Sequence, residues 1–199
     1  LVAVLPPEMA FARDRFNEGV LAEWYAPGFD DSAWGRKDTF LTWDQQDPPE
    51  DDKGHDYDGY GWYRGAFEVD KRFTGKPVRL WLGGAINEVW VWINGQYVGH
   101  GKHQIWWMSG PREFEIADQL KPGQRNTIAI RVWNNAEIGG LRGRGFLWSP
   151  NSAQLEDEKR EAEEKARLAE EKKKQDEEKQ RQENAKKAEE LKKADTAKP

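Results

Sequence analysis

Cysteine is absent from the 199-residue sequence. Its absence excludes a disulfide scaffold and a thiolate metal site, and it leaves the compartment open. No stretch approaches the roughly 18 consecutive apolar residues of a membrane-spanning helix. The opening residues 1–7 are too short for a secretory signal and lack its basic start. The net charge is −5, and neither part of the chain is basic. We therefore expect neither a membrane nor a nucleic acid as a partner.

Tryptophan, in contrast, is abundant and unevenly distributed. All 11 tryptophans lie between Trp24 and Trp148. This region can bury a sizeable core on its own, whereas the residues after it offer little apolar material. The sequence therefore predicts a domain over residues 1–150 and a charged tail over residues 151–199, which we expect to be helical or partly disordered.

The tail has the composition of a solvated helix. Residues 154–193 contain no Gly, Pro or aromatic residue and consist mainly of strong helix formers. Opposite charges recur four residues apart, as in Glu170/Lys174, and such pairs support a helix. Ser152 is a candidate N-cap. The few leucines do not sustain a heptad repeat, which argues against a coiled coil. Two interpretations stay open: a charged spacer, or a helix that binds a partner or oligomerises.

Residues 1–150 have the pattern of an all-β domain. Short runs rich in aromatic and β-branched residues occur at 62–69, 78–82, 88–93 and 126–133, and turn signals separate them. Asn94-Gly95 predicts a tight hairpin between two of these runs. By alternation, Ile128, Ile130 and Val132 share one face of a strand. Short strands at regular spacing predict a sandwich or barrel. We also expect Trp62, Trp81 and Trp90 in the core.

Several ordered segments of the domain resemble the sugar-binding domain of glycoside hydrolase family 2, found in β-galactosidase- and β-glucuronidase-type proteins. Each segment is weakly diagnostic alone, but together they span about residues 9–148, and the tail lies outside the resemblance. The segments are WYAPGFDDSAW at 24–34, YDGYGWYR at 57–64, LWLGG at 80–84, NEVWVWING at 87–95, FEI at 114–116, LKPG at 120–123, NTIAIRV at 126–132 and GG at 139–140.

The resemblance implies a galactose-binding-domain-like jelly-roll β-sandwich with a C-terminal charged α-helical tail. In that family the domain performs no chemistry, packs on a catalytic barrel, and contributes loops to the sugar site. The resemblance therefore implies a non-catalytic carbohydrate-binding accessory domain, an extracellular or periplasmic location, and a neighbouring catalytic domain as partner. The expected ligand is galactoside- or glucuronide-like, and the parent protein is expected to be a glycoside hydrolase. Residues 141–145 (LRGRG) depart from the family's usual Ile-aromatic continuation.

Sugar binding needs flat aromatic faces together with fixed polar groups. Trp106 and Trp107 are adjacent, so in a strand one would be buried and the other exposed for stacking. Tyr57 and Tyr60 lie on the loop that leads into the strand containing Trp62. In the family, the loop that corresponds to the residues after 133 faces the sugar site. The asparagines of that loop are also typical turn formers. The candidate sugar-binding residues are Trp106, Trp107, His103, Tyr57, Tyr60, Asn134, Asn135 and Arg142.

No catalytic residue, metal ligand set or cofactor motif is recognisable in the sequence. The acidic residues 44–58 are expected to form a surface loop; they form no recognised calcium-loop motif, although an oxygen-rich loop could hold a structural Ca²⁺. A flexible acidic cluster is not the preorganised carboxylate pair of a glycosidase. Two functions stay open: a carbohydrate-binding accessory domain, and a structural or interaction module that packs on a neighbouring domain without binding sugar.

Overall fold

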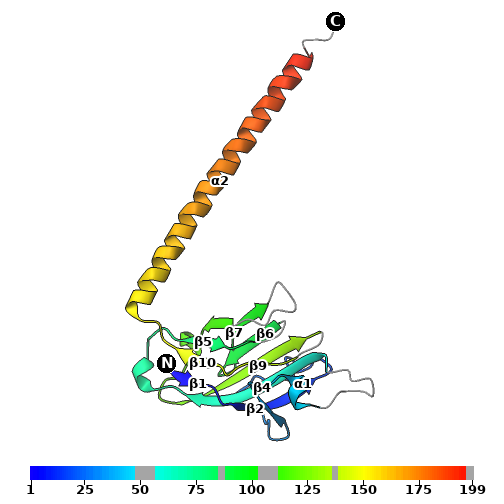
Figure 1. The fold of residues 1–199 in the computed structure, drawn as a ribbon, viewed down its shortest axis with the longest axis vertical. Coiled ribbons are helices and arrows are strands. Elements are labelled where there is room, and N and C mark those ends of the chain that lie inside the picture. The colour runs from blue at the N-terminus through cyan, green and yellow to red at the C-terminus, as the bar shows by residue number, and fades with distance from the viewer. Residues whose placement is uncertain (48–56, 85–87, 103–111, 136–138, 196–199) are drawn as a thin grey trace. The chain divides into compact units, whose positions relative to one another are not determined.

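The structure is a computed structural model that describes residues 1–47, 57–84, 88–102, 112–135 and 139–195. The chain divides into two compact units, Leu1–Pro150 and Asn151–Pro199. The first unit is built from two antiparallel sheets, one of four strands and one of six (Figure 1). The β-sandwich and the C-terminal helix predicted from the sequence are confirmed.

The larger sheet has the strand order β3-β2-β4-β9-β6-β7. Its centre is the pair β4 and β9, whose residues are in register from Gly59 opposite Asn134 to Glu68 opposite Arg125. These long strands are the ones that the sequence pattern indicated. The strands are β2 (Glu8–Asp14), β3 (Gly35–Asp38), β4 (Gly59–Glu68), β6 (Glu88–Ile93), β7 (Gln96–Lys102) and β9 (Arg125–Asn134).

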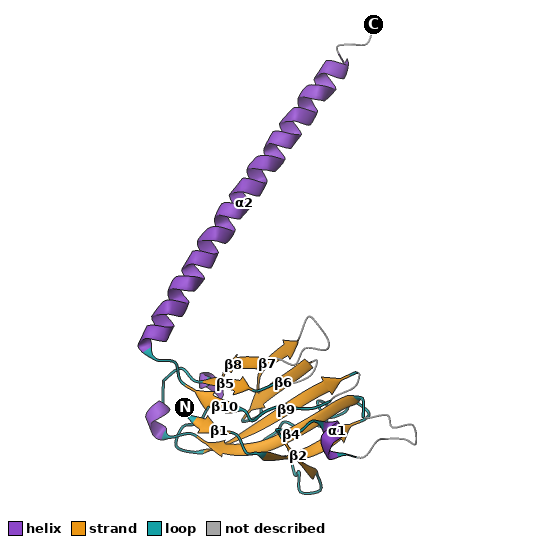
Figure 2. Cartoon of the chain, viewed as in Figure 1, coloured by secondary structure: helices purple, strands orange, loops and turns teal. Residues whose placement is uncertain are grey.

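The smaller sheet has the order β1-β10-β5-β8, and strands of both sheets are drawn as arrows in Figure 2. Of its four strands, the sequence pattern indicates only β5, because the other strands are short. Short helical turns connect the strands of the sandwich. The elements are β1 (Ala3–Val4), β5 (Arg79–Leu82), β8 (Arg112–Glu115), β10 (Phe146–Trp148), α1 (Trp43–Gln46), η1 (Lys71–Phe73) and η2 (Ala117–Gln119).

The hairpin between β6 and β7 has the turn that its sequence predicts. Asn94 and Gly95 both adopt positive φ angles, 52° and 78°. Two consecutive residues with positive φ define a type I′ turn, whose twist matches that of the flanking strands. The turn therefore sets the pairs next to it, Ile93 opposite Gln96 and Trp92 opposite Tyr97, and the register then shifts at an irregularity between Val91 and Trp92.

The main core lies between the two sheets. Ile128, Ile130 and Val132 of β9 point into it, as their alternation predicts, and they belong to one apolar cluster with Leu80 and Leu82 of β5. Trp62 is buried too, but on the opposite face of its sheet. Trp81 and Trp90, which we expected in the core, are only half-buried, because their alternation places them on the outward faces of their sheets.

A second apolar cluster lies on the outer face of the six-stranded sheet. Trp62 and Trp92 form its centre, and the connection between β2 and β3 packs on them. Tyr25 stacks on Trp92 with ring centroids 5.3 Å apart and planes 9° apart, and Trp24 contacts Trp62 edge-on at 6.1 Å. We call residues 15–34 the covering segment. It accounts for one of the matched sequence segments, WYAPGFDDSAW.

Two buried polar side chains anchor the covering segment at its two ends. Asp14 accepts hydrogen bonds from the backbone N–H of Glu18 at 2.7 Å and of Gly19 at 3.0 Å, and from the indole of Trp62 at 2.9 Å. Arg64 pairs with Asp31 at 2.8 Å and donates to the carbonyl of Ala26 at 3.0 Å. These bonds fix the segment over the middle of the sheet, on the face that carries Trp62 and Arg64.

The stretch 44–58, which we expect to form a surface loop, begins with a helical turn. Residues 44–46 belong to α1, which has a capping box at Thr42, and Asp47 is the C-cap. Asp47 forms ion pairs with Arg13 at 2.9 Å and with Lys37. Trp43, the first residue of α1, is buried in the main core, so packing holds this turn in place. Residues 48–56 lie outside the described part of the chain.

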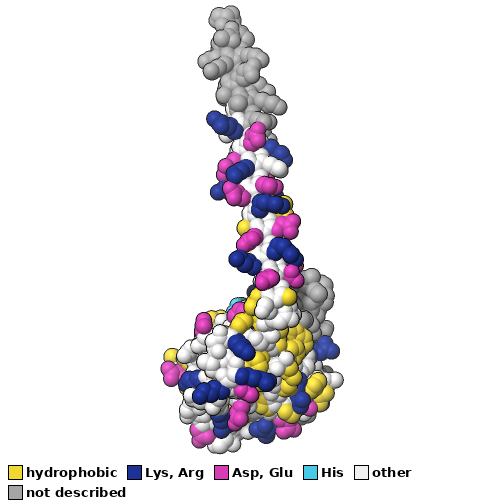
Figure 3. Space-filling model, turned by 90° about the vertical axis from the view of Figure 1, so that its left-hand side faces the viewer, with side chains coloured by type: hydrophobic (Ala, Val, Ile, Leu, Met, Phe, Trp, Pro, Cys, Tyr) yellow, Lys and Arg dark blue, Asp and Glu magenta, His cyan; other side chains and the backbone are white. Residues whose placement is uncertain are grey.

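The second unit is one helix, α2 (Ser152–Asp195). Its N-cap is Asn151 and not the predicted Ser152: the Asn151 side chain accepts from the N–H of Gln154, and the Gln154 side chain accepts from the N–H of Asn151, both at 2.9 Å. This reciprocal pair is a capping box. Acidic and basic side chains alternate along the described surface of the helix (Figure 3), and Lys174 pairs with Glu170 at 2.7 Å as predicted.

Candidate functional site

The predicted site residues that the structure describes gather mainly at one end of the six-stranded sheet. There β4 begins and β9 ends, because Gly59 is opposite Asn134 and Tyr60 is opposite Trp133. This register brings Tyr57, Tyr60, Asn134 and Asn135 together. Arg142 is exposed in the segment after Gly140, and its N–H donates to the carbonyl of Gly84 at 2.9 Å. His103, Trp106 and Trp107 follow β7 and lie outside the described residues.

Tyr57 and Asn134 face the interior rather than solvent. Tyr57 is 5% exposed, and its hydroxyl donates to the carbonyl of Tyr60 at 2.8 Å. Its ring lies 5.5 Å from that of Trp43, and burial raises the pKa of its hydroxyl. Asn134 is fully buried, and its Nδ2 donates to Oδ1 of Asp58 at 3.2 Å. Both side chains therefore fix the ends of β4 and β9, while Tyr60 and Asn135 stay accessible.

The accessible part of this region is a set of rings on the outer face, of which Tyr60, Trp90 and Trp133 are half-buried and His100 is exposed. We call Tyr60, Trp90, His100, Arg131 and Trp133 the aromatic shelf. The ring of Tyr60 lies 6.4 Å from that of Trp133 and 6.1 Å from that of Trp90. Trp90 in turn stacks on His100, with centroids 4.6 Å apart and planes 8° apart. The shelf lies beside the covering segment and extends across β4, β9, β6 and β7.

Arg131 lies behind these rings and is only 7% exposed. Its guanidinium is 3.7 Å from the centroid of Tyr60 and 4.9 Å from that of Trp90, and it donates to Oδ1 of Asn17. Its Nε is buried without a hydrogen-bond partner among the described residues. Burial lowers the pKa of Arg131, but guanidinium groups stay protonated in proteins. The shelf therefore contains a permanent cation that orders its tyrosine and tryptophan rings.

Glu88 gives the shelf a carboxylate at its edge. Its side chain accepts from Nε2 of His100 and from Nζ of Lys102, both at 2.9 Å. Partial burial acts to raise the pKa of Glu88, but the hydrogen bonds from Lys102 and His100 outweigh it and hold the pKa below its usual range. The carboxylate is thus ionised at neutral pH and available as a fixed acceptor.

The shelf combines aromatic faces with fixed polar groups. Aromatic faces can stack on the C–H groups of a sugar, and fixed polar groups can bond its hydroxyls. In the described parts of the chain, no group of three or more His, Asp or Glu side chains is placed to hold a metal ion. Nor is any helix of these parts long and apolar enough to cross a membrane.

The sequence prediction found Tyr60 but missed the rest of the shelf. Trp90, Arg131 and Trp133 were present in runs already assigned as strands, and their alternation placed Trp90 and Arg131 on the face away from the core. The sequence prediction did not align the outward residues of β6 with those of β9. Strands β6 and β9 align Trp90 with Arg131 and Glu88 with Trp133.

Solved structures share the fold of the sandwich. The β-glucuronidase from Ruminococcus gnavus, in complex with a C6-substituted uronic isofagomine, superposes with a TM-score of 0.63 at 18% sequence identity, covering 74% of this chain and 28% of that one. A glycosyl hydrolase family 2 member from Bacteroides cellulosilyticus superposes with a TM-score of 0.61 at 24% identity, covering 76% of this chain and 21% of that one. The fold is therefore that of a β-sandwich domain of large glycoside hydrolases.

Sequence comparison identifies the domain more closely. The profile of the family described as "Beta-galactosidase second all-beta domain" matches residues 18–137, and the chain belongs to this family. The family is a small β-domain and not the catalytic barrel, so the expectation of a non-catalytic domain resembling those of glycoside hydrolase family 2 is confirmed.

Curated relatives agree with this assignment. A β-galactosidase of Thermoanaerobacter pseudethanolicus is 38% identical over 81 residues, covering 40% of this chain and 10% of the relative. A β-galactosidase of Bacteroides ovatus is 32% identical over 129 residues, covering 62% of this chain and 15% of the relative. A β-glucuronidase of Paenibacillus borealis is 33% identical over 79 residues, covering 40% and 13%. The matched regions are thus a small part of each relative.

Proposed function

We propose that this chain is a carbohydrate-binding accessory domain of a larger glycoside hydrolase family 2 protein, and that it binds sugar on the aromatic shelf. The observation that carries the proposal is Trp133. Its ring is half-buried on the outer face, contacts the shelf through Tyr60, and lies opposite Glu88 in the sheet. A ring with one supported side, next to a fixed carboxylate, offers a stacking surface and a hydroxyl acceptor together.

The names of the relatives supply the class of ligand. They are β-galactosidases and a β-glucuronidase, so β-linked galactosides and glucuronides are the first ligands to test. Catalysis by the larger protein would belong to a neighbouring domain that this domain contacts. Binding to one shelf with few contacts is expected to be weak and reversible.

The test is a titration of the folded chain with β-galactosides, β-glucuronides and plant polysaccharides, in which calorimetry or NMR detects the binding. Trp133→Ala should weaken binding of the best ligand by about tenfold or more, since one stacking contact is worth on the order of 1–3 kcal/mol by analogy with base stacking on aromatic side chains. Trp148→Ala removes a half-buried tryptophan from the four-stranded sheet and serves as the matched control. It should bind as the wild type does.

The proposal fails if the folded wild-type chain binds none of these glycans. It also fails if Trp133→Ala and Trp148→Ala bind with the affinity of the wild type. Circular dichroism of both variants separates a lost ligand contact from a lost fold.

A second candidate function is packing on a neighbouring domain without direct sugar binding. The observation that favours it is the covering segment, where Phe16 is 83% exposed and Leu21 is 90% exposed. Exposed large apolar side chains in one segment are typical of contact surfaces. Hydrogen exchange of the full-length parent protein tests this function: residues 15–22 should be more protected there than in the isolated chain, and equal protection would rule it out.

A further inference from the structure

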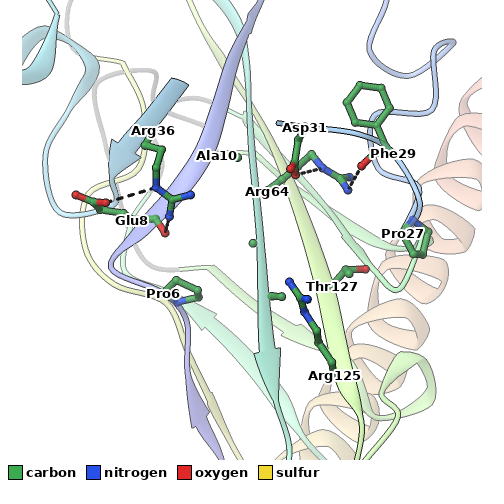
Figure 4. Close-up of a pocket in the computed structure, with 12 residues that line it drawn as sticks. Pro6, Glu8, Ala10, Pro27, Phe29, Asp31, Arg36, Arg64, Arg125 and Thr127 are labelled. Carbon is green, nitrogen blue, oxygen red and sulfur yellow. Dashed lines mark hydrogen bonds and ion pairs between the residues drawn. The ribbon is translucent and has the colours of Figure 1, made fainter. Parts of the chain in front are cut away.

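The covering segment leaves a second region of the outer face open, at the end of the sheet away from the aromatic shelf. A depression of about 580 Å³ lies there (Figure 4). Small residues of three strands, Ala10, Ala66 and Thr127, line it. Pro27 and Phe29 of the covering segment stand on one side, with Pro6 and Arg36 on the other. Its size and mixed lining are those of a small-ligand site.

Two of the three arginines that line the depression are already paired with carboxylates. Arg64 is paired with Asp31 at 2.8 Å and is almost fully buried. Arg36 is paired with Glu8 at 3.5 Å and also donates to the carbonyl of Glu8 at 3.1 Å. Figure 4 shows that the Arg36 guanidinium lies nearer the centre of the depression than the Glu8 carboxylate does. The two acids of the lining are therefore balanced by these two bases.

Arg125 is the third arginine of the lining, and no carboxylate among the described residues pairs with it. Among the described residues its guanidinium has neither an ion pair nor a hydrogen bond, and it extends from β9 into the depression (Figure 4). Thr127 follows two residues later on the same face of β9. Its Oγ1 is buried without a hydrogen-bond partner in the described part of the chain. Buried polar atoms are normally bonded, so this hydroxyl has hydrogen-bonding capacity that the protein does not use.

We infer that the depression binds the oxyanion group of an acidic saccharide, either a carboxylate or a sulfate ester. Arg125 would pair with the oxyanion, since guanidinium groups bond such groups through two parallel N–H donors. The Thr127 hydroxyl, after rotation of its side chain, would donate a further hydrogen bond. Pro27 and Phe29 would contact the C–H groups of the sugar ring. The sugar part of this inference rests on the proposed function, whereas the anion part rests on Arg125 and Thr127.

The experiment compares three disaccharides on the full chain by calorimetric titration: digalacturonate, a monosulfated galactose disaccharide, and neutral digalactose. Arg125→Gln should lower the affinity for the preferred acidic disaccharide by about tenfold to a hundredfold, the range expected for a charge-assisted hydrogen bond. Thr127→Val keeps the shape of the side chain and should lower it by severalfold. Added salt should weaken acidic binding in the wild type and have little effect in Arg125→Gln.

Arg72→Gln is the matched control, because Arg72 is an exposed arginine of η1 outside the depression, and its loss should leave acidic binding unchanged. The acid that binds more tightly shows whether a carboxylate or a sulfate is preferred. The inference is overturned if the acidic disaccharides bind no more tightly than the neutral one, or if Arg125→Gln binds them as the wild type does.

The two proposals can fail separately. If acidic disaccharides bind through Arg125 while neutral glycans do not bind at all, the shelf proposal fails and the present inference stands. If neutral glycans bind through Trp133 and Arg125→Gln changes nothing, the inference fails and the shelf proposal stands. If Trp133→Ala removes neutral binding but leaves the Arg125-dependent acidic binding intact, two distinct sites are established.

Discussion

At the scale of single residues, buried charge gives the sandwich a specific dependence on pH. Asp47 lies between Arg13 and the almost fully buried Lys37. Partial burial acts to raise the pKa of Asp47, but hydrogen bonds from Lys37 and Arg13, together with their charges, outweigh it and hold the pKa below its usual range. A carboxyl with a lowered pKa in the folded state stabilises the fold above its unfolded pKa of about 3.9, and this contribution is lost as the pH falls through the folded pKa.

We therefore expect Asp47→Asn to lower the free energy of unfolding by about 1.5–3 kcal/mol at pH 7, the range for hydrogen bonds to charged groups. The difference from the wild type should begin to shrink below about pH 4, where the carboxyl of the unfolded wild type takes up a proton, and it should be lost as the pH falls through the lowered pKa of the folded state. Urea unfolding at several pH values measures both. Asp118→Asn, at an exposed carboxylate of η2, should change little at any pH. A difference for Asp47→Asn that stays constant from pH 7 to pH 3 would contradict the assignment.

The matched motif Gly139-Gly140 is made of glycines because the Trp43 ring packs against it. A Cβ on Gly139 would lie 2.2 Å from Cε3 of Trp43, and Gly140 has a φ of +100° beside the same ring. The Trp43 indole donates to the Tyr63 hydroxyl at 2.7 Å, so the ring is not free to move aside. The motif was evident in the sequence, but its cause was not, because Trp43 is distant along the chain.

At the scale of elements, the strands predicted from sequence are those with a long apolar alternation. Strands β4, β5, β6 and β9 were found for this reason, and the hairpin turn was found from Asn94-Gly95. Strand β2 was missed. Its inward residues Met9 and Phe11 alternate with the half-buried Ala10 and Ala12, so its outward positions lack the polar side chains by which a half-buried strand is recognised in a sequence.

The same limit applies to the site. Tyr57 and Asn134 were predicted as sugar-binding residues from their places next to strand ends, and the structure buries both side chains. The burial of Tyr57 depends on α1, where Trp43 packs on its ring, whereas Asn134 is an inward residue of β9 that bonds Asp58. The sequence placed α1 in a polar loop, so the direction of these side chains could not be predicted from local pattern.

The covering segment yields a prediction for an element as a whole. Arg64 connects it to β4 through Asp31 and through carbonyls of the segment. Arg64→Met keeps an aliphatic side chain but removes every one of these bonds. We expect the free energy of unfolding to fall by about 1.5–3 kcal/mol, the range for hydrogen bonds to a charged group, because the remaining Asp31 is partly exposed. Tryptophan fluorescence should shift to the red as Trp62 and Trp92 become hydrated.

Arg72→Met is the control for this substitution, because the Arg72 side chain is exposed in η1. It should alter neither the stability nor the emission maximum. If Arg64→Met unfolded at the wild-type midpoint with unchanged emission, the covering segment would be held by its aromatic contacts alone.

At the scale of the whole molecule, the two units differ in how they are stabilised. Both apolar clusters lie within the sandwich, whereas every described side chain of α2 is exposed. A helix without a packed face depends on its intrinsic propensity, its cap and its charge pairs, and it loses structure gradually on heating. A sandwich with one cooperative core unfolds in a single transition.

We therefore expect thermal unfolding followed at 222 nm to show two phases: an early, broad loss of helical signal, and then a sharp transition of the sandwich. Deleting residues 151–199 should remove the first phase and leave the midpoint of the second unchanged. High salt should reduce the amplitude of the first phase in the full chain, because it screens charge pairs such as Glu170–Lys174 and so lowers the helical content before heating. A concentration-dependent, cooperative first phase would instead show that α2 associates with a second copy, which is the oligomerising interpretation of the tail. Sedimentation velocity over the same concentration range decides between the two, since a solitary helix leaves the chain monomeric throughout.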